Sequence, residues 1–160
     1  MADASSVRAQ SALPAATGRN ASSIRYIDGE VAVANGTNWV YPGRQEVTFV
    51  GGTTDAAFYV ANRAMEIVAI RQVHSVAGTD AGAVTLAVTK DTGTAAPGAG
   101  TTVQTGTFNL KSTANTVQAG TLTATAANKK LAAGDRLSAN FTGTVTDVAG
   151  VVVTVTLRPI

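Results

Sequence analysis

The chain of 160 residues contains no cysteine and no long apolar run. Without cysteine, no disulfide framework can stabilise the fold, and the redox compartment cannot be read from cysteine usage. No segment approaches the roughly 20 consecutive apolar residues that a membrane span needs, and the first residues show no basic region followed by an apolar stretch. We therefore expect neither export through such a signal nor a position in a membrane.

Charged and aromatic residues are both scarce. Charged side chains make up 14% of the chain, whereas about 25% is usual in soluble domains, so much of the surface must consist of Thr, Ser, Asn and Gly. Aromatic residues make up 5%, so the core depends on Val, Ala, Leu and Ile. Such a core gives modest stability per residue unless chains associate and bury more apolar area. We expect a homo-oligomer.

The C-terminal half is built mainly from Thr, Ala, Val and Gly, and it ends in a strictly alternating strand. Val151, Val153, Val155 and Leu157 fall on one face of this strand, and the residues between them fall on the other. Runs of similar composition recur at short intervals and are separated by turn signals rich in Gly, Pro and Asp. The expected strands are residues 37–41, 46–50, 57–61, 66–76, 84–90, 105–110, 120–125, 137–142 and 151–157.

Short strands joined by Gly-rich turns predict an all-β fold, an antiparallel β-sandwich formed by residues 35–160. The run 65–73 is apolar on both faces, so it is either covered on two sides or lies at a subunit contact. Residues 56–70 include good helix formers, but the β-branched and aromatic residues among them favour strands. We expect two strands there, with a bend at Asn62-Arg63.

Residues 1–34 are expected to form an extended N-terminal arm and linker, because they are rich in Ala and Ser and show no sustained period. Residues 1–25 contain three arginines, Arg8, Arg19 and Arg25, and one acid, Asp3. Their net charge is therefore +2, which equals the net charge of the whole chain. Three readings stay open: a solubilising terminus, an anchor that orders on a partner, or a nucleic-acid contact. Arginines without interleaved aromatics are a weak nucleic-acid signal, so we expect no nucleic-acid partner.

If the arm anchors the chain, its candidate contact residues are Arg8, Arg19, Arg25 and Tyr26. Trp39 and Tyr41 fall on the same face of the short strand where arm and domain meet. These two aromatic residues are either core side chains or anchors for a partner. Both are therefore candidate interface residues.

Residues suited to catalysis or metal binding are few and scattered. His74 is the only histidine, so a Ser-His-Asp set would have to combine it with Ser75 or Ser138 and an aspartate, and no nucleophile elbow accompanies it. A single histidine on a strand is more often a surface or interface side chain. The acids in turns stand alone, without the clustered oxygen ligands of a calcium site: Asp80, Asp91, Asp135 and Asp147. We expect no catalytic residue, no cofactor and no metal, and hence no enzyme.

The stretch 92–102 is rich in Gly, Ala and Pro, but it lacks the lysine and the spacing of a phosphate-binding loop. We expect it to be a surface connection between strands. Arg136, at the start of a later strand, is expected to be an ordinary exposed cation.

Several phrases of the C-terminal half follow one another in a fixed order: KDTGTAAPGAGT at 90–101, FNLK at 108–111, TANTVQAG at 113–120, AAN at 126–128, LAAGDRL at 131–137 and AGVVVTV at 149–155. This half resembles a module of tailed-bacteriophage head proteins. The resemblance implies a jelly-roll-like β-sandwich on the outside of a capsid, as in capsid decoration (cement) or head-fibre proteins. It also implies a homotrimer that binds the major capsid protein, and it implies no catalytic residue.

On this basis we expect a structural virion protein on the outer capsid surface, where it stabilises contacts between major capsid proteins. A second function stays open, that of a receptor- or carbohydrate-binding module of a phage head or tail fibre, because jelly rolls bind sugars and a fold does not fix a function. An exposed cluster of Trp39, Tyr41 and Tyr59 would favour this alternative, and their burial would weaken it.

Overall fold

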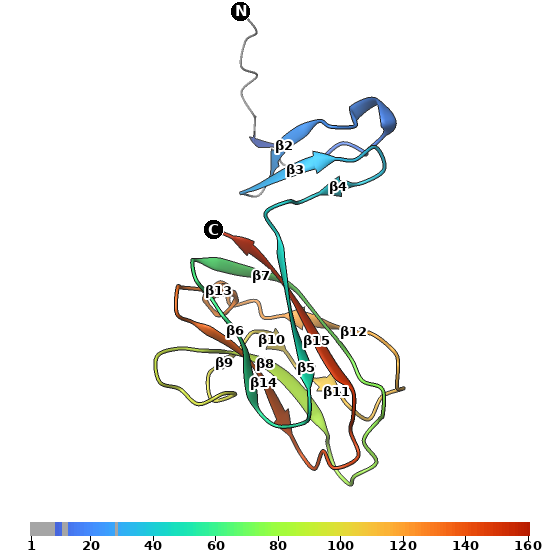
Figure 1. The fold of residues 1–160 in the computed structure, drawn as a ribbon, viewed down its shortest axis with the longest axis vertical. Helices are drawn as coiled ribbons and strands as arrows, with labels where there is room; N and C mark the ends of the chain where they lie inside the picture. The colour runs from blue at the N-terminus through green and yellow to red at the C-terminus, as the bar shows by residue number, and fades with distance from the viewer. Residues whose placement is uncertain (1–8, 11–12, 28) are drawn as a thin grey trace, which may run out of the picture. The chain divides into compact units, whose positions relative to one another are not determined.

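The computed structural model describes residues 9–10, 13–27 and 29–160, and most of its regular structure is β-strand (Figure 1). The chain divides into two compact units, Met1–Arg44 and Gln45–Pro159, which we call the N-terminal and the C-terminal unit. We expected residues 35–44 to belong to the β-sandwich. In the structure they belong to the N-terminal unit, because β4 pairs with the strand that precedes it.

The N-terminal unit contains a four-stranded sheet in the order β1-β2-β3-β4, in which β1–β2 is parallel and the other pairs are antiparallel. Its elements are β1 (Ala9–Gln10), the 3-10 helix η1 (Gly18–Asn20), β2 (Ile24–Ile27), β3 (Glu30–Ala34) and β4 (Trp39–Val40). Three of these strands, β1, β2 and β3, lie in the region that we expected to be an extended arm. Residues 1–8, 11–12 and 28 of that region, which include Arg8, lie outside the described residues.

The C-terminal unit is made of two antiparallel sheets that pack together as a β-sandwich. The first has the order β10-β12-β7-β15-β5, with β13 also paired to β7: β10 (Gln104–Thr105), β12 (Gln118–Leu122), β7 (Met65–Val73), β15 (Val151–Pro159), β5 (Gln45–Gly51) and β13 (Lys130–Leu131). The second has the order β11-β8-β14-β6, with β9 paired to β8: β11 (Phe108–Asn109), β8 (Thr85–Asp91), β14 (Arg136–Thr142), β6 (Ala56–Val60) and β9 (Thr101–Thr102).

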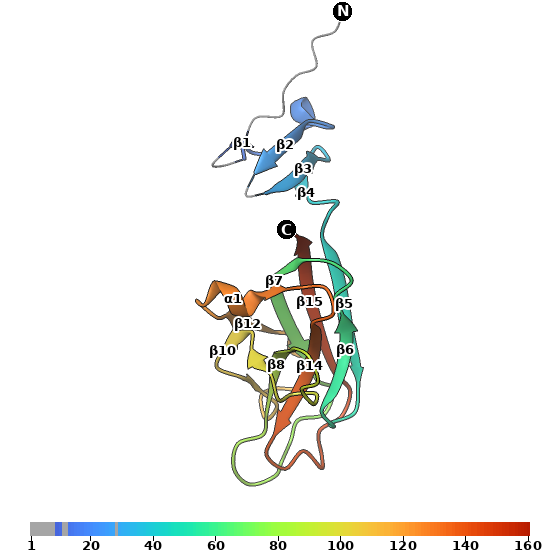
Figure 2. The same ribbon diagram turned by 90° about the vertical axis from the view of Figure 1, so that its left-hand side faces the viewer.

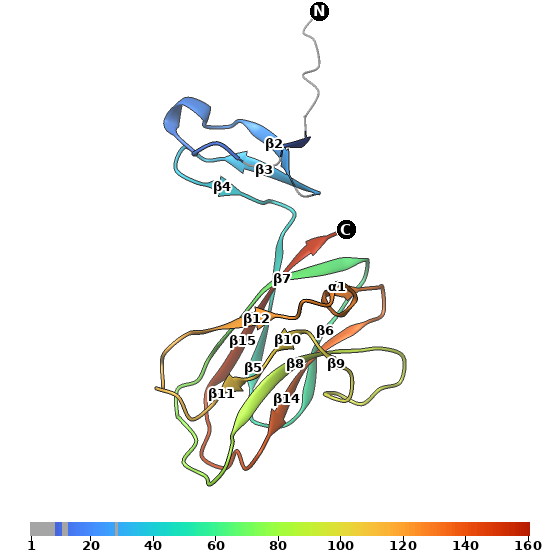
Figure 3. The ribbon, with the colours of Figure 1, turned by 180° about the vertical axis from the view of Figure 1, so that it is seen from behind.

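The core lies between these two sheets, which overlie each other in Figure 1 and in the reverse view of Figure 3. The residues of β15 that we expected on one face are all fully buried, and so are two alternate residues in each of β8 and β14: Val151, Val153, Val155, Leu157, Leu86, Val88, Leu137 and Ala139. The short helix α1 (Ala126–Lys129) lies beside β7 (Figure 2). The alternation of the sequence therefore predicts the core correctly.

Each of the nine expected runs contains a strand, but residues 105–110 do not form a single one. Gly106 adopts a φ of +74° there, in the left-handed region that favours glycine. The chain crosses at this point from β10 in one sheet to β11 in the other. The bend expected at Asn62-Arg63 is confirmed, since these residues separate β6 from β7.

A β-bulge in β7 explains why residues 65–73 are apolar on both faces. Leu157 pairs with Ile67 and Thr156 pairs with Ala69, so Val68 is an extra residue without a partner on β15. Met65 and Ile67 are buried before the bulge, whereas Ile70 and Gln72 are buried after it. The bulge therefore reverses which residues of this strand face the core.

Gly120 provides a test of how closely the core is packed. A Cβ atom at this position would lie 2.7 Å from Cδ1 of Ile70 and 2.8 Å from Cζ of Phe108, both buried side chains. We expect Gly120→Ala to lower the free energy of unfolding by about 1–3 kcal/mol through overpacking. Urea unfolding followed by circular dichroism measures this change.

Gly52→Ala is the matched control, because a Cβ atom at Gly52 meets no atom within 4 Å. Its effect should stay within about 0.5 kcal/mol of the wild type. Equal destabilisation by the two substitutions would contradict the packing described around Gly120.

Candidate functional site

The strands β2 and β3 form a tight hairpin in the N-terminal unit. Ile27 pairs with Glu30, so only two residues separate the strands, and their sequence is Asp28-Gly29. Asp-Gly between two alternating runs is among the strongest local hairpin signals, because such a turn needs a positive φ. Gly29 has a φ of +80°. This local signal explains why a segment of Ala/Ser-rich composition contains paired strands.

One face of this small sheet is apolar and open to solvent. Cross-strand pairing aligns Ile24 with Val33 and Val40, and Tyr26 with Val31, so all five side chains share one face. The exposed fraction is 51% for Ile24, 40% for Tyr26, and 47% for both Val31 and Val40. We call these five residues the N-terminal apolar face.

The opposite face of the sheet is covered. Ile27, Ala32 and Ala34 are buried there. The segment before β2 continues its pairing with β3, since Ser22 N donates to Ala34 O (2.7 Å) and Ala34 N donates to Ser23 O (3.0 Å). The indole Nε1 of Trp39 donates a 2.6 Å hydrogen bond to the carbonyl of Pro14. Residues 13–23 are therefore held against the strands rather than extended.

A charged pair closes the end of the N-terminal unit. The guanidinium of Arg44 donates to both carboxylate oxygens of Glu30, at 3.0 and 2.9 Å, and it lies 3.9 Å from the centre of the Tyr41 ring. The Glu30 side chain is only 6% exposed, and a bidentate partner compensates the burial of its charge. Tyr41 is thus occupied by a contact within its own unit.

The structure brings together only part of the expected contact set. Tyr26 lies on the N-terminal apolar face, whereas Arg25 points to the other side of the sheet and donates to the carbonyl of Ile24 (2.9 Å). Arg19 is exposed in η1. Trp39 lies on the covered face and is half-buried, as Tyr41 is. Arg8 lies outside the described residues.

Reasoning from the sequence missed the apolar partners of Tyr26. Ile24, Val31, Val33 and Val40 belong to short alternating runs on both sides of Asp28-Gly29. That alternation, taken with the hairpin signal, could have identified them.

The N-terminal unit has a very small core. Among its described residues the buried apolar side chains are Ile27, Ala32 and Ala34, and units of this size seldom fold stably without a disulfide, a metal or a partner. Cysteine is absent from the chain, and the described residues contain no group of three or more His, Asp or Glu that could hold a metal ion. An association that covers the N-terminal apolar face would supply the missing apolar burial.

His74 lies in the core, so the expectation of a surface or interface histidine is wrong. It is 0% exposed, its Nε2 donates to the carbonyl of Ser112 (3.1 Å), and its Nδ1 accepts from Nε2 of Gln72 (3.0 Å). We assign this tautomer because a carbonyl can only accept. The bulge at Val68 is the cause, since it turns the even-numbered residues after it toward the core.

The serines that we weighed as companions of His74 bond elsewhere. Ser75 Oγ donates to the carbonyl of Ala149 (3.1 Å), and Ser138 Oγ donates to Asp91. In the part of the chain that the structure describes, the ring of His74 contacts neither serine through a hydrogen bond. The Ser-His-Asp arrangement considered from the sequence is therefore not assembled.

Asp91 anchors the loop that connects β8 to β9. Its carboxylate is fully buried and accepts hydrogen bonds from Gly100 N (2.8 Å), Gly98 N (3.3 Å), Thr89 Oγ1 (3.1 Å) and Ser138 Oγ. The expected turn role is found at Asp135, which accepts from Ala132 N (2.8 Å). Asp91 instead fixes a loop by accepting hydrogen bonds from its main-chain N–H groups.

Arg136 holds the same loop from the side, so the expectation of an ordinary exposed cation is wrong. Its guanidinium donates to the carbonyls of Gly93 (2.9 Å) and Ala95 (2.6 Å), and Asn140 Nδ2 donates to the carbonyl of Gly98 (2.7 Å). Residues 92–100 are thus fixed by buried and half-buried side chains of β8 and β14.

Comparison with protein-family models, curated proteins and solved structures finds no match for this chain. Within the described residues, no helix has the length and apolar character needed to cross a membrane.

The single tryptophan allows the stability of the N-terminal unit to be measured separately, because Trp39 lies in that unit. We expect its fluorescence transition in urea at a lower concentration than the circular-dichroism transition, which is dominated by the larger C-terminal unit. The small core of the N-terminal unit is the reason.

The variant W39F/F141W moves the tryptophan into the C-terminal unit, where Phe141 packs against the core. Its fluorescence should follow the circular-dichroism transition. Coincident transitions for both proteins would show that the two units unfold together, contrary to the expectation.

Proposed function

We propose that this chain is a structural virion protein that binds the outer surface of a phage capsid and stabilises contacts between major capsid proteins. The observation that carries the proposal is the N-terminal apolar face, an exposed apolar surface on a unit whose own core is too small to stabilise it. A unit of this kind gains stability when its apolar face is covered by a partner.

The resemblance of the C-terminal half to phage head proteins supports the proposal. The sequence segments that carry the resemblance include the loop anchored by Asp91 and most of the central strand β15. We propose a jelly-roll-like connection of the strands and a homotrimer, as the resemblance implies. The major capsid protein is the proposed partner, with no nucleic acid, membrane or cofactor involved.

Multivalency would make weak contacts sufficient. Covering the exposed part of each side chain in the N-terminal apolar face contributes about 1–2 kcal/mol before the cost of ordering. Three linked copies convert the second and third contacts into intramolecular events, which raises the apparent affinity without new contacts. Arg19, exposed beside this sheet, offers a cation for a carboxylate on the capsid.

The carbohydrate-binding alternative has less support. Trp39, Tyr41 and Tyr59 are each half-buried. The indole of Trp39 bonds to Pro14, the ring of Tyr41 packs against Arg44, and Tyr59 packs against the core of the sandwich. Side chains with such partners present less free ring surface for stacking on sugars.

Val31→Asp tests the N-terminal apolar face as the contact surface. A carboxylate on this face, opposite Tyr26, would be buried without a partner on binding, so we expect at least about tenfold lower capsid occupancy. Val31 is 47% exposed, so the fold should tolerate the change. The measurement mixes the protein with undecorated shells of the phage that encodes it and counts bound copies.

Val60→Asp is the matched control, because Val60 is 60% exposed on β6 of the C-terminal unit. It should bind like the wild type. A wild-type chain that ignores the shells would overturn the proposed function. Wild-type binding that Val31→Asp leaves unchanged would overturn only the choice of surface.

A further inference from the structure

The outer face of the first sheet in the C-terminal unit carries a row of apolar side chains. Cross-strand pairing arranges its central residues in three rows across β5, β15 and β7: Val50-Val152-Val73, Thr48-Thr154-Arg71 and Glu46-Thr156-Ala69. Seven of these nine side chains are Val, Thr or Ala. We call the nine residues the β15 face. Strands with one face in water usually carry polar or charged residues on that face, so the row Val50-Val152-Val73 is typical of a covered surface.

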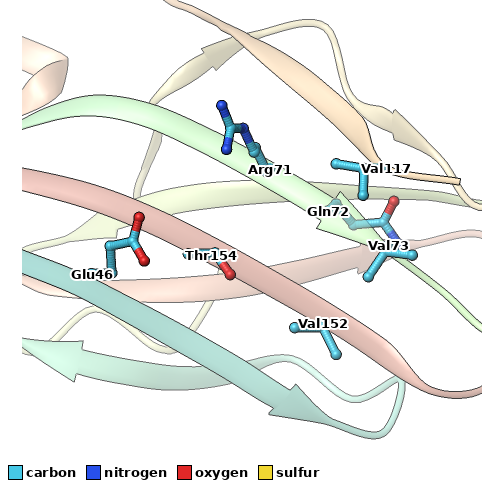
Figure 4. A pocket seen from close by; sticks show the side chains of 7 residues that line it. All are labelled: Glu46, Arg71, Gln72, Val73, Val117, Val152 and Thr154. Carbon is cyan, nitrogen blue, oxygen red and sulfur yellow. The ribbon is translucent and has the colours of Figure 1, made fainter. Parts of the chain in front are cut away.

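A shallow groove of about 250 Å³ runs across the β15 face (Figure 4). Val152, Val73 and the neighbouring Val117 form its apolar part, and Glu46 and Arg71 stand on either side of Thr154. Val50, in the same row as Val152, is 74% exposed, and Val117 is 62% exposed. The groove therefore combines apolar side chains with one anion and one cation.

The two charges of the groove have no partner within the described chain. Arg158 and Glu66, at the end of the same sheet, form an ion pair of 2.7 Å. By contrast, no hydrogen bond or ion pair joins the side chain of Glu46 or Arg71 to any described residue. They lie on strands that flank β15, about 10 Å apart laterally, and their rows are displaced along the strands.

We propose that the β15 face is the interface between copies of this chain, with Glu46 of one copy paired to Arg71 of the next. In a closed cyclic assembly one flank of each subunit meets the other flank of its neighbour. Because the anion lies on one flank of β15 and the cation on the other, the anion of each subunit pairs with the cation of its neighbour in every contact. The small side chains let two sheet faces approach closely.

This inference deepens the homo-oligomeric part of the proposed function, but it rests on the surface of the C-terminal unit and needs no capsid. A chain that associates through the β15 face and ignores capsids would keep the inference and overturn the proposed function. A chain that binds capsids as a monomer would overturn the inference and keep the proposed binding to capsids.

The absence of cysteine makes disulfide crosslinking a clean test. In the full-length variant E46C/R71C, the two thiols of one chain are separated by two strand spacings and cannot be bridged, because a disulfide requires Cα atoms within about 7 Å. We expect mild oxidation to produce covalent dimers and closed trimers on a non-reducing gel. Dimers that never extend to trimers would support the face with two subunits instead of three.

The matched control is V60C/T101C, which places two exposed thiols on the other sheet, at β6 and β9. After oxidation it should run as a monomer on the non-reducing gel, because its thiols lie away from the proposed interface. An E46C/R71C protein that also remains monomeric, or a control that crosslinks equally well, would overturn the inference.

Charge exchange provides an independent measurement. E46R and R71E should each weaken association at least about tenfold in sedimentation equilibrium, because each brings like charges together in every contact. The double variant E46R/R71E should restore the wild-type mass. Single variants that associate like the wild type, or a double variant that stays dissociated while folded, would overturn the pairing.

Discussion

The C-terminal unit depends on β15, which pairs with β7 on one side and β5 on the other while its alternate residues fill the core. A period of two side chains makes this double role possible, because every second residue turns inward while the backbone remains fully paired. The strand uses Val and Leu on its inner face and mainly Thr and Val on its outer face. The same period that builds the core also produces the outer surface that we assign to subunit contact.

Most of the sandwich could be predicted because its strands alternate plainly, as 137–142 and 151–157 do. His74 could not be placed correctly, because counting alternate positions from Met65 and Ile67 puts it on the outer face. Only the unpaired Val68 reverses the count. A bulge depends on the partner strand, here β15, and so on contacts between residues far apart in the chain.

At the candidate contact surface the necessary information was local and present in the sequence, unlike at His74. Tyr26 was identified, but Ile24, Val31 and Val40 were not, because Ala/Ser-rich composition outweighed a local signal. Asp28-Gly29 and the alternation on either side of it carried the necessary information. The buried role of Asp91 could not be read from the sequence, since Ser138 and Gly100, which bond to it, come from separate segments.

The loop at residues 92–100 is held by Asp91, Arg136 and Asn140, and at the loop itself each of these side chains grips main-chain atoms only. Hydrogen bonds to main-chain atoms do not depend on which side chains the loop carries, except where a Cβ atom will not fit, as at Gly100. The outward side chains of this loop can therefore be substituted, in evolution or by design, while its backbone conformation is kept. The loop is thus a suitable place to display a foreign peptide.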